Sequence, residues 1–337
     1  MNILADLHAL GFKGAIYKLF SDRLNYNVYI PVGKEWFTEG YWYLFKHFTH
    51  NQMEELANQF LLPETSPTLL KNECPNVKFI TLNEVKNKNI EFDIIIASVP
   101  HHYTRFEKLI SDFNLKSKLI FHSGNNFHHD DPDIKNVKNL LTSAMGPYKL
   151  YSAPNKVFYH HEMDTILFSK KITCNPKSVV NLQHCMDDFD TFSKLESALP
   201  DWDFKTYGGN NRDGILPFDN MHTVIKNTGF LFHVKKTDEG YGMMIHSAFA
   251  CGTPVITDTE YMTVYYDRSI ANTASLLFNN DTIIDIKKLS VKEIVYLLEK
   301  RSDNYQYYSD QVYKKFKEVI DFDEECNNIK LFIEKLL

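Results

Sequence analysis

The sequence predicts an α/β protein made of two Rossmann-like domains that face each other across a cleft. Its 337 residues are enough for two domains of ordinary size with separate cores. In both halves, short apolar runs typical of buried strands alternate with segments of helical spacing. One stretch, residues 229–258, holds a strand, a glycine loop, a buried helix and a second strand in direct succession. Each observation favours parallel sheets covered by helices.

Buried strands in the first half are expected at residues 1–7, 77–82, 92–99, 118–121, 139–144 and 156–160, with a helix over 15–24. The run at 92–99 is the clearest, because a continuous apolar run is typical of a central parallel strand. Polar residues follow two of these strands, with His101 after one and His122 after the next. Ligands of open α/β sheets bind at the carboxyl ends of the strands, so both histidine-bearing loops are expected to point into one crevice.

The second half is expected to begin after a passage at residues 163–176. Its expected strands are 178–182, 204–207, 229–234 and 255–257, and its expected helices are 188–199, 243–251, 291–300, 311–317 and 329–337. The helix at 243–251 is apolar on nearly every face, which indicates burial. Gly252 and Pro254 end it with the usual glycine and breaker.

The order of elements in residues 229–258 predicts an anion site. A right-handed crossover from strand to helix to parallel strand directs the loop and the helix N-terminus toward the carboxyl edge of the sheet. Turn residues fill the loop, at 237–242. Backbone N–H groups at the start of a helix suit a negatively charged ligand.

Two short motifs in this stretch resemble a known signature. Glu239–Gly242 reads EGYG, and after four further residues Ser247–Thr257 reads SAFACGTPVIT. Together they resemble the donor-site signature of retaining, nucleotide-sugar-dependent glycosyltransferases of the GT-B fold. The family form is Glu-Gly-Phe-Gly, an apolar run, then Glu-Ala-Met-Ala-Cys-Gly-Thr-Pro-Val-Ile. The alternative is an ordinary Rossmann-like βαβ unit with a well-packed helix.

The resemblance implies roles for three residues. Glu239 occupies the position of the first glutamate, which in the family binds the sugar. Ser247 replaces the second glutamate, which in the family binds the ribose hydroxyls, and this is a departure from the pattern. His122 resembles the family's histidine that follows a strand of the first domain and approaches the donor sugar. The resemblance therefore implies that His122 and Glu239 act in catalysis, whereas the alternative for each is a structural role.

The resemblance also implies a binding loop and a cation for the donor diphosphate. The expected donor-binding residues are Lys235, Lys236, Gly240, Tyr241, Gly242 and Ser247. Family members often supply Arg or Lys after the first strand of the second domain, but Gln183–Cys185 reads QHC here. The two lysines before the glycine loop are the nearest candidates. The alternative is that both are solvated.

The acceptor side and the domain boundaries are also implied by the resemblance. The loop after the first strand carries Asp6 and His8, and with His101 these residues are expected on the acceptor side of the cleft; a simple polar turn is the alternative. In the family the last helices return to the first domain. We therefore expect domains at residues 1–163 and 164–312, and returning helices at 313–337.

Composition narrows the functional classes. The net charge of −6 argues against a constitutive nucleic-acid coat. Five widely spaced cysteines without a Cys-x-x-Cys pair fit free thiols in a reducing compartment. No apolar run reaches the roughly 18 residues that span a bilayer, and the N-terminus lacks the features of a signal peptide. A cytoplasmic protein without a transmembrane segment is expected.

The predicted function is transfer of a sugar from a nucleoside-diphosphate sugar to a hydroxyl acceptor, with retention and without a metal. No metal site and no cofactor beyond the donor substrate are expected. The alternatives are a GT-B-like nucleotide-sugar epimerase, a phage-type DNA base glucosyltransferase and a non-catalytic nucleotide-sugar-binding module. The acceptor stays open among a glycan, a lipid-linked sugar, a protein and modified DNA. The sequence predicts no oligomeric state.

Overall fold

The chain divides into two compact units. The computed structural model describes residues 1–5, 18–31, 76–124, 131–182, 188–208, 211–216, 218–235, 239–260 and 272–337. Unit 1 consists of Met1–Glu162 and Phe322–Leu337, and unit 2 of Met163–Asp321. Each unit is built around its own parallel sheet and its own core.

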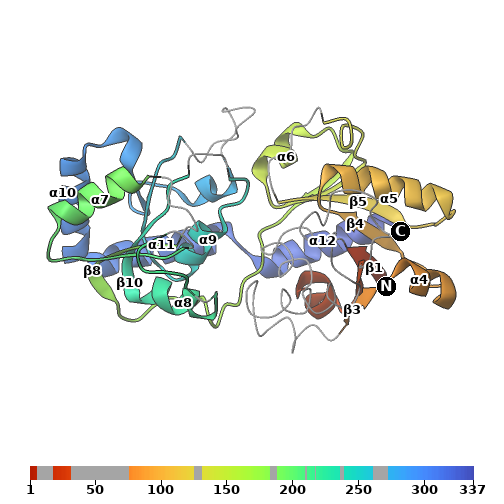
Figure 1. Cartoon of the computed structure of the whole chain (residues 1–337), viewed down its shortest axis with the longest axis horizontal. Helices are drawn as coiled ribbons and strands as arrows, with labels where there is room; N and C mark the ends of the chain where they lie inside the picture. The colour runs from red at the N-terminus through yellow and green to blue at the C-terminus, as the bar shows by residue number, and fades with distance from the viewer. Residues whose placement is uncertain are drawn as a thin grey trace. The chain divides into compact units, whose positions relative to one another are not determined.

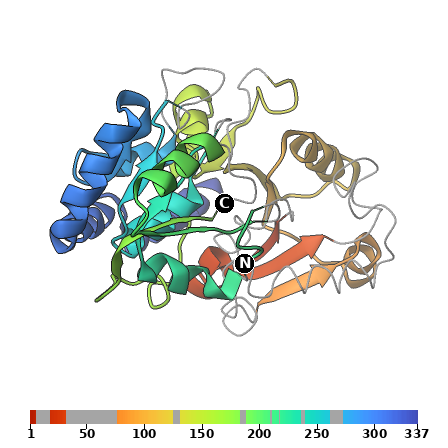
Figure 2. The same cartoon turned by 60° about the vertical axis from the view of Figure 1, so that its left-hand side comes forward.

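Unit 1 is built on a sheet whose described strands all run parallel. They are β1 Asn2–Ala5, β2 Asn27–Pro31, β3 Val77–Ile80, β4 Ile94–Ala97, β5 Lys118–Ser123, β6 Asn139–Thr142 and β7 Asn155–Phe158. Their order is β3-β2-β1-β4-β5-β6-β7. The red-to-orange strands β1, β2 and β3 lie side by side in Figure 2. The order reverses between β1 and β4, so the carboxyl ends of these two strands form the switch point where open α/β sheets bind ligands.

Both faces of this sheet are buried, which explains the continuous apolar runs in the sequence. Successive side chains of a strand point to opposite faces. Ile94 and Ile96 of β4 therefore join one core cluster, and Ile95 and Ala97 join another. Strands that are covered on both sides need apolar residues at every position, as predicted for residues 92–99.

Helices cover both faces of this sheet (Figure 1). They are α4 Leu82–Lys88, α5 Pro100–Asp112, α6 Met145–Leu150 and α12 Phe322–Leu336, with a π-helical turn η1 at Lys18–Arg23. Ile329 and Ile333 of α12 pack in the first cluster. Tyr103 and Phe106 of α5 pack in the second. The end of the chain thus completes the core that its beginning starts.

The start of α5 corrects one expectation from the sequence. His101 was expected on a loop after β4, but it lies in the first turn of α5. Pro100 is the first residue of this helix. Proline suits that position because its φ is already near the helical value and its missing N–H has no partner there in any helix.

Unit 2 is built on a second sheet of parallel strands. Its described strands are β8 Asn175–Asn181, β9 Asp203–Thr206, β10 Thr228–Phe232, β11 Val255–Thr257 and β12 Ile283–Asp285. The helices are α7 Phe189–Ala198, α8 Phe218–Asn227, α9 Met243–Ala250, α10 Val291–Asp303 and α11 Tyr305–Val319, with 3₁₀ turns η3 Thr273–Leu277 and η4 Ile286–Lys288. The strand order is β12-β11-β10-β8-β9. The switch point of this sheet lies between β8 and β10.

Strand β10 is the centre of unit 2, and all five of its residues are buried. Phe230 and Phe232 pack in the core cluster, and the ring of Phe192 from α7 lies edge-on to Phe232 with centroids 5.3 Å apart. Gly229 lies against the neighbouring strand, where a Cβ atom would approach the carbonyl oxygen of Pro176 to 2.5 Å. Only glycine allows β10 and β8 to come this close.

The exit of α9 is fixed by tight packing and a buried hydrogen-bond network. Gly252 has φ +69°, and a Cβ atom there would lie 2.9 Å from Oγ and 3.0 Å from the carbonyl oxygen of Ser309. The Thr253 hydroxyl donates to the carbonyl of Ile225 at 3.0 Å and accepts from Nζ of Lys171 at 3.0 Å. Burial lowers the pKa of Lys171 to about 8, although nearby thiols oppose the shift. The Cys-Gly-Thr-Pro part of the motif therefore has a structural role.

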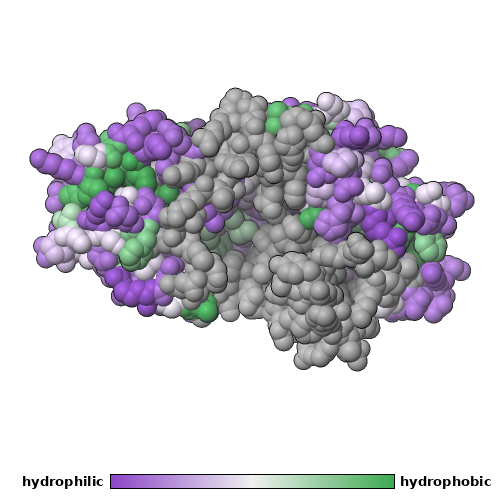
Figure 3. All heavy atoms as spheres, turned by 45° about the horizontal axis from the view of Figure 1, so that its top comes forward, coloured by the Kyte–Doolittle hydropathy of each residue, from purple (hydrophilic) through white to green (hydrophobic). Residues whose placement is uncertain are grey.

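The surface is mostly polar in the view of Figure 3, where the described residues are largely purple with smaller green areas. Ile166 and Ile172 are the most exposed large hydrophobic residues described, at 82% and 90%. Among the described residues, no helix combines the length and the apolar character needed to cross a membrane.

Replacement of Gly252 by alanine should destabilise unit 2. A left-handed backbone costs an alanine about 1–2 kcal/mol, and the contact with Ser309 adds to this cost. Gly214→Ala is the matched control, because Gly214 also has positive φ (+77°) but has no atom within 4 Å of the new Cβ. Thermal unfolding should show a larger loss for Gly252→Ala than for Gly214→Ala. Equal losses would contradict the packing argument.

Candidate functional site

The carboxyl edge of β10 and the loop into α9 form the candidate site of unit 2. Backbone pairing continues one residue past β10, where the N–H of His233 donates to the carbonyl of Ile256 at 2.9 Å. Lys235 follows, and Glu239 stands just before the glycines. Lys236 lies outside the described residues. These residues follow a strand at the switch point of the sheet, where the fold class places its ligands.

Glu239 forms a close pair with His233. Nε2 of His233 lies 2.9 Å from Oε2 of Glu239, and the two side chains are 2% and 26% exposed. Burial alone would raise the pKa of Glu239, but the charge and hydrogen bond of His233, with the charges of Lys235 and His246, hold the pKa below its usual range. The carboxylate is therefore ionised at neutral pH.

The glycine loop is held by the segment before η3. The side-chain amide of Asn272 donates to the carbonyl of Glu239 at 2.9 Å, and the N–H of Thr273 donates to the carbonyl of Gly240 at 3.3 Å. Both Asn272 and Thr273 are fully buried. These bonds fix the loop backbone before any ligand binds.

Tyr241 and Gly242 set the start of α9. The ring of Tyr241 stacks on that of His246 with centroids 4.1 Å apart and planes 7° apart. Nδ1 of His246 lies 2.9 Å from the carbonyl oxygen of Gly242, which only accepts, so Nδ1 carries the hydrogen. Gly242 is the N-cap with φ +80°, and it has no side chain to cap the helix. The N–H of Ile245 already donates to the carbonyl of Gly242 at 3.1 Å, so the N–H groups of Met243 and Met244 are the ones of the first turn that an anion can use.

Ser247 and Thr257 follow the glycine loop in the sequence, and both are buried. Ser247 lies in the middle of α9 and is 3% exposed. Thr257, the last residue of β11, is fully buried, and its hydroxyl has no hydrogen-bonding partner among the described residues. Sequence reasoning did not single out Thr257 or His233 as site residues. The signal that could have found them is a polar residue that follows or ends a buried apolar run.

In unit 1, His122 belongs to a buried cluster at the carboxyl edge of the sheet. His122 lies near the end of β5 and is fully buried, and its Nε2 lies 2.8 Å from the hydroxyl of Tyr159. Nε2 of His161 lies 2.7 Å from Oγ of Ser143. Three adjacent strands supply these residues at their ends, because β5 pairs with β6 and β6 with β7.

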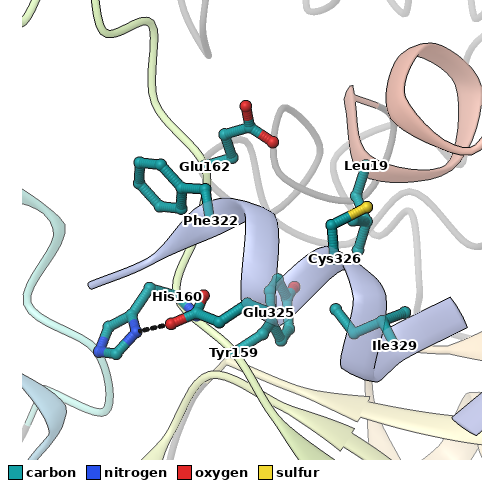
Figure 4. A pocket seen from close by; sticks show the side chains of 8 residues that line it. All are labelled: Leu19, Tyr159, His160, Glu162, Phe322, Glu325, Cys326 and Ile329. Atoms are coloured by element: carbon teal, nitrogen blue, oxygen red, sulfur yellow. Dashed lines mark hydrogen bonds and ion pairs between the residues drawn. The ribbon is translucent and has the colours of Figure 1, made fainter. Parts of the chain in front are cut away.

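Helix α12 contacts the end of β7 through Glu325. One carboxylate oxygen accepts from the backbone N–H of His160 at 2.7 Å, and the other lies 2.6 Å from Nδ1 of the same residue. Figure 4 shows this pair beside a small pocket, lined also by Tyr159, Glu162 and Cys326 among others. The pair ties the last helix to the segment that carries Tyr159.

Of the residues expected on the acceptor side, the structure describes His101 alone. His101 is exposed in the first turn of α5, with its ring 4.5 Å from that of His102. Asp6 and His8 lie outside the described residues. Within the described ranges, no group of three or more His, Cys, Asp or Glu residues is arranged to hold a metal ion. The structure thus brings Lys235, Glu239 and the glycine loop together in unit 2, and it places His101 and His122 in unit 1.

No protein-family model and no curated protein matches the sequence. Solved structures of glycosyltransferases have a similar fold. Anabaena Alr3699/HepE, in complex with UDP-glucose, has a TM-score of 0.66 at 11% identity over 99% of this chain and 100% of that chain. An alpha-glucosyltransferase in complex with UDP and a 13-mer DNA containing an HMU base has a TM-score of 0.60 at 10% identity, over 99% of both chains. The lipopolysaccharide outer core galactosyltransferase WaaB has a TM-score of 0.60 at 12% identity, over 100% of both chains.

The TM-scores of 0.60–0.66 show a shared fold, and at 10–12% identity the likeness shows the fold alone. The chain has the GT-B fold, with an α/β architecture of two parallel sheets and their helices. The fold class predicted from the sequence is confirmed.

Replacement of Glu239 by glutamine should change how stability depends on pH. Folding lowers the pKa of Glu239, so the ionised carboxylate stabilises the fold above the unfolded pKa of about 4.3, and this stabilisation is lost as pH falls through the lower folded pKa. Urea unfolding should show that the free energy of unfolding of wild type exceeds that of Glu239→Gln by the largest amount above about pH 5. The difference should shrink at lower pH.

Glu107→Gln is a control of opposite sign. Burial raises the pKa of Glu107, although Lys138 opposes the shift. Ionisation of Glu107 therefore disfavours the fold, and wild type should lose stability relative to Glu107→Gln as pH rises. A difference between wild type and Glu239→Gln that is the same at every pH would contradict the effect of His233 on Glu239.

Proposed function

We propose that the protein is a glycosyltransferase that moves a sugar from a nucleoside-diphosphate sugar to a hydroxyl acceptor. The observation that carries this proposal is the ionised Glu239 beside a preformed glycine loop at the start of α9. The fold similarity to glycosyltransferases in complex with UDP or UDP-glucose supports it. Unit 2 is the proposed donor-binding unit.

The donor diphosphate is proposed to bind at the N-terminus of α9. First-turn N–H groups and the helix dipole favour an anion there. The charge of Lys235 lowers the pKa of Glu239, which supports a position of this ammonium group near the same loop. Together they provide positive charge for a diphosphate leaving group without a metal. Lys236 is a second candidate for the same role.

Glu239 is proposed to bind the sugar. Its Oε2 is engaged by His233, while its Oε1 has no hydrogen-bonding partner among the described residues. A carboxylate oxygen of this kind accepts hydrogen bonds from sugar hydroxyls, and such bonds are strengthened by the charge. His233 fixes the carboxylate in one position, which reduces the entropy lost on binding.

The ribose contact is proposed to differ from that of the family signature. A glutamate at position 247 would offer two acceptor oxygens to the ribose diol, whereas Ser247 offers one hydroxyl. Ser247 is buried inside α9, where a longer side chain has little room. We therefore expect ribose and deoxyribose donors to bind with similar affinity.

The same proposal includes a retaining outcome, independence from metals and cofactors, and a cytoplasmic location. It also includes an acceptor-side role for Asp6, His8 and His101. The acceptor is not part of it. One structural neighbour was solved with DNA and another is named for lipopolysaccharide, so this fold serves unlike acceptors.

A nucleotide-sugar panel tests the proposed function. Thermal unfolding of the intact chain with UDP, GDP and their common hexose conjugates should show one conjugate that raises the melting temperature, because ligands that bind only the folded state stabilise it. Slow release of free hexose from that donor should follow. Interconversion of intact nucleotide sugars would instead identify an epimerase, and binding without turnover a non-catalytic module.

Replacement of Glu239 by alanine should lower kcat/KM about tenfold to a hundredfold, because a charge-assisted hydrogen bond contributes roughly 1.5–3 kcal/mol. Glu260→Ala is the matched control, since Glu260 is an exposed glutamate of the same unit that pairs with Lys287 at 3.1 Å. Rate and melting temperature are measured for both variants. A less stable Glu239→Ala enzyme with unchanged kcat/KM would show that Glu239 serves the fold alone.

Activity should survive removal of divalent cations. The proposed stabilisation of the diphosphate comes from α9 and Lys235, so a chelator should change the initial rate by less than about twofold. The rate is measured before and after dialysis against chelator, and again after addition of magnesium or manganese. Loss of activity in chelator and recovery with either metal would contradict this part of the proposal.

A further inference from the structure

The chain passes between the two units twice, and one arginine contacts it at both points. It leaves unit 1 through the exit segment, residues 159–162, and it comes back through the return segment, residues 322–330 of α12. Arg23 is the last residue of η1. Its Nε donates to Oε2 of Glu162 at 2.9 Å, and its Nη1 lies 2.8 Å from Oδ1 of Asp323. One guanidinium group therefore holds both segments.

The exit segment and the return segment also contact each other directly. Both carboxylate oxygens of Glu325 bind His160, one at its backbone N–H (2.7 Å) and the other at Nδ1 (2.6 Å). Figure 4 shows this pair beside a small pocket that residues of both segments line, among them Glu162 and Phe322. Leu19 of η1 lines the same pocket. These three parts of unit 1 thus meet in one junction.

The two ion pairs of Arg23 differ in strength because they differ in burial. The side chains of Arg23 and Glu162 are 29% and 14% exposed, whereas that of Asp323 is 82% exposed. Burial raises the pKa of Glu162, and the charge and hydrogen bond of Arg23 oppose this shift. An exposed ion pair adds little stability, but a largely buried carboxylate that loses its partner is costly. Glu162 is therefore the main anchor of Arg23.

We propose that this junction makes the exit segment and the return segment one mechanical element, a hinge end that opens and closes as a unit. Motion of one unit against the other bends the chain at both passages, because the chain is continuous through both. Segments that are joined at their unit 1 ends cannot bend independently, so Arg23 couples the two passages. The element belongs to the folded chain with or without a ligand. It stands or falls apart from the proposed glycosyltransferase function.

Hydrogen exchange of the intact chain tests whether the two segments open together. In Arg23→Gln, the exit segment and the return segment should both exchange about two- to tenfold faster than in wild type, and by a similar factor, because one opening exposes both. Strand β4, in the core of the same unit, should exchange as in wild type. Acceleration of one segment alone, or of neither, would overturn the proposal. Equal acceleration of β4 would also overturn it, because the whole unit would then be less stable.

Arg212→Gln is the matched control. Arg212 also bridges two carboxylates, with Nη1 2.9 Å from Glu196 and Nε 3.5 Å from Asp213, but all three residues belong to unit 2. This variant should leave the exit segment and the return segment as in wild type. Faster exchange of both segments in Arg212→Gln would contradict a role specific to Arg23.

Glu162→Gln distinguishes coupling from local damage, and it replaces Arg23→Gln if that variant does not fold. Glu162 belongs to the exit segment and bonds to Arg23, so purely local damage would speed exchange in the exit segment only. The proposal expects the return segment to exchange about two- to fivefold faster as well, because the two segments open together. Unchanged exchange in the return segment would show that the segments open independently, and the proposal would be wrong.

Discussion

The pairing of Glu239 with His233 is the interaction on which the site of unit 2 depends. It crosses the loop between β10 and α9, so one hydrogen bond of 2.9 Å links the end of the central strand to the start of the buried helix. The same contact keeps a largely buried carboxylate ionised. Without it, burial would favour a neutral acid, which is a weaker acceptor for hydroxyl groups.

The two halves of the sequence motif have different physical tasks. The glycine half shapes a loop whose backbone is clamped by Asn272 and Thr273, and whose last glycine begins α9 in a left-handed conformation. The Cys-Gly-Thr-Pro half packs against α11 and the buried Lys171. The second half positions α9, and the first half is the part that we propose contacts the donor.

The sequence predicted the elements well where apolar periodicity is strong, and it failed where long-range pairing decides. Strands such as β4 and β10 follow from continuous apolar runs, because both faces of each sheet are covered. The His122–Tyr159 pair was missed, since 37 residues separate its members and only the order of β5, β6 and β7 brings them together. Lys236, Asp6 and His8 lie outside the described residues, so their roles stay predictions.

Hydrogen exchange of the intact chain with and without UDP tests the central claim most directly, because it reports the backbone amides that the claim names. Binding of the diphosphate at the start of α9 should slow exchange within residues 240–245, since bound phosphate oxygens accept from N–H groups at the start of this helix. The backbone amides of α10, another helix of unit 2, should exchange at unchanged rates. Saturating UDP that leaves residues 240–245 unprotected, while protecting another segment, would contradict the account.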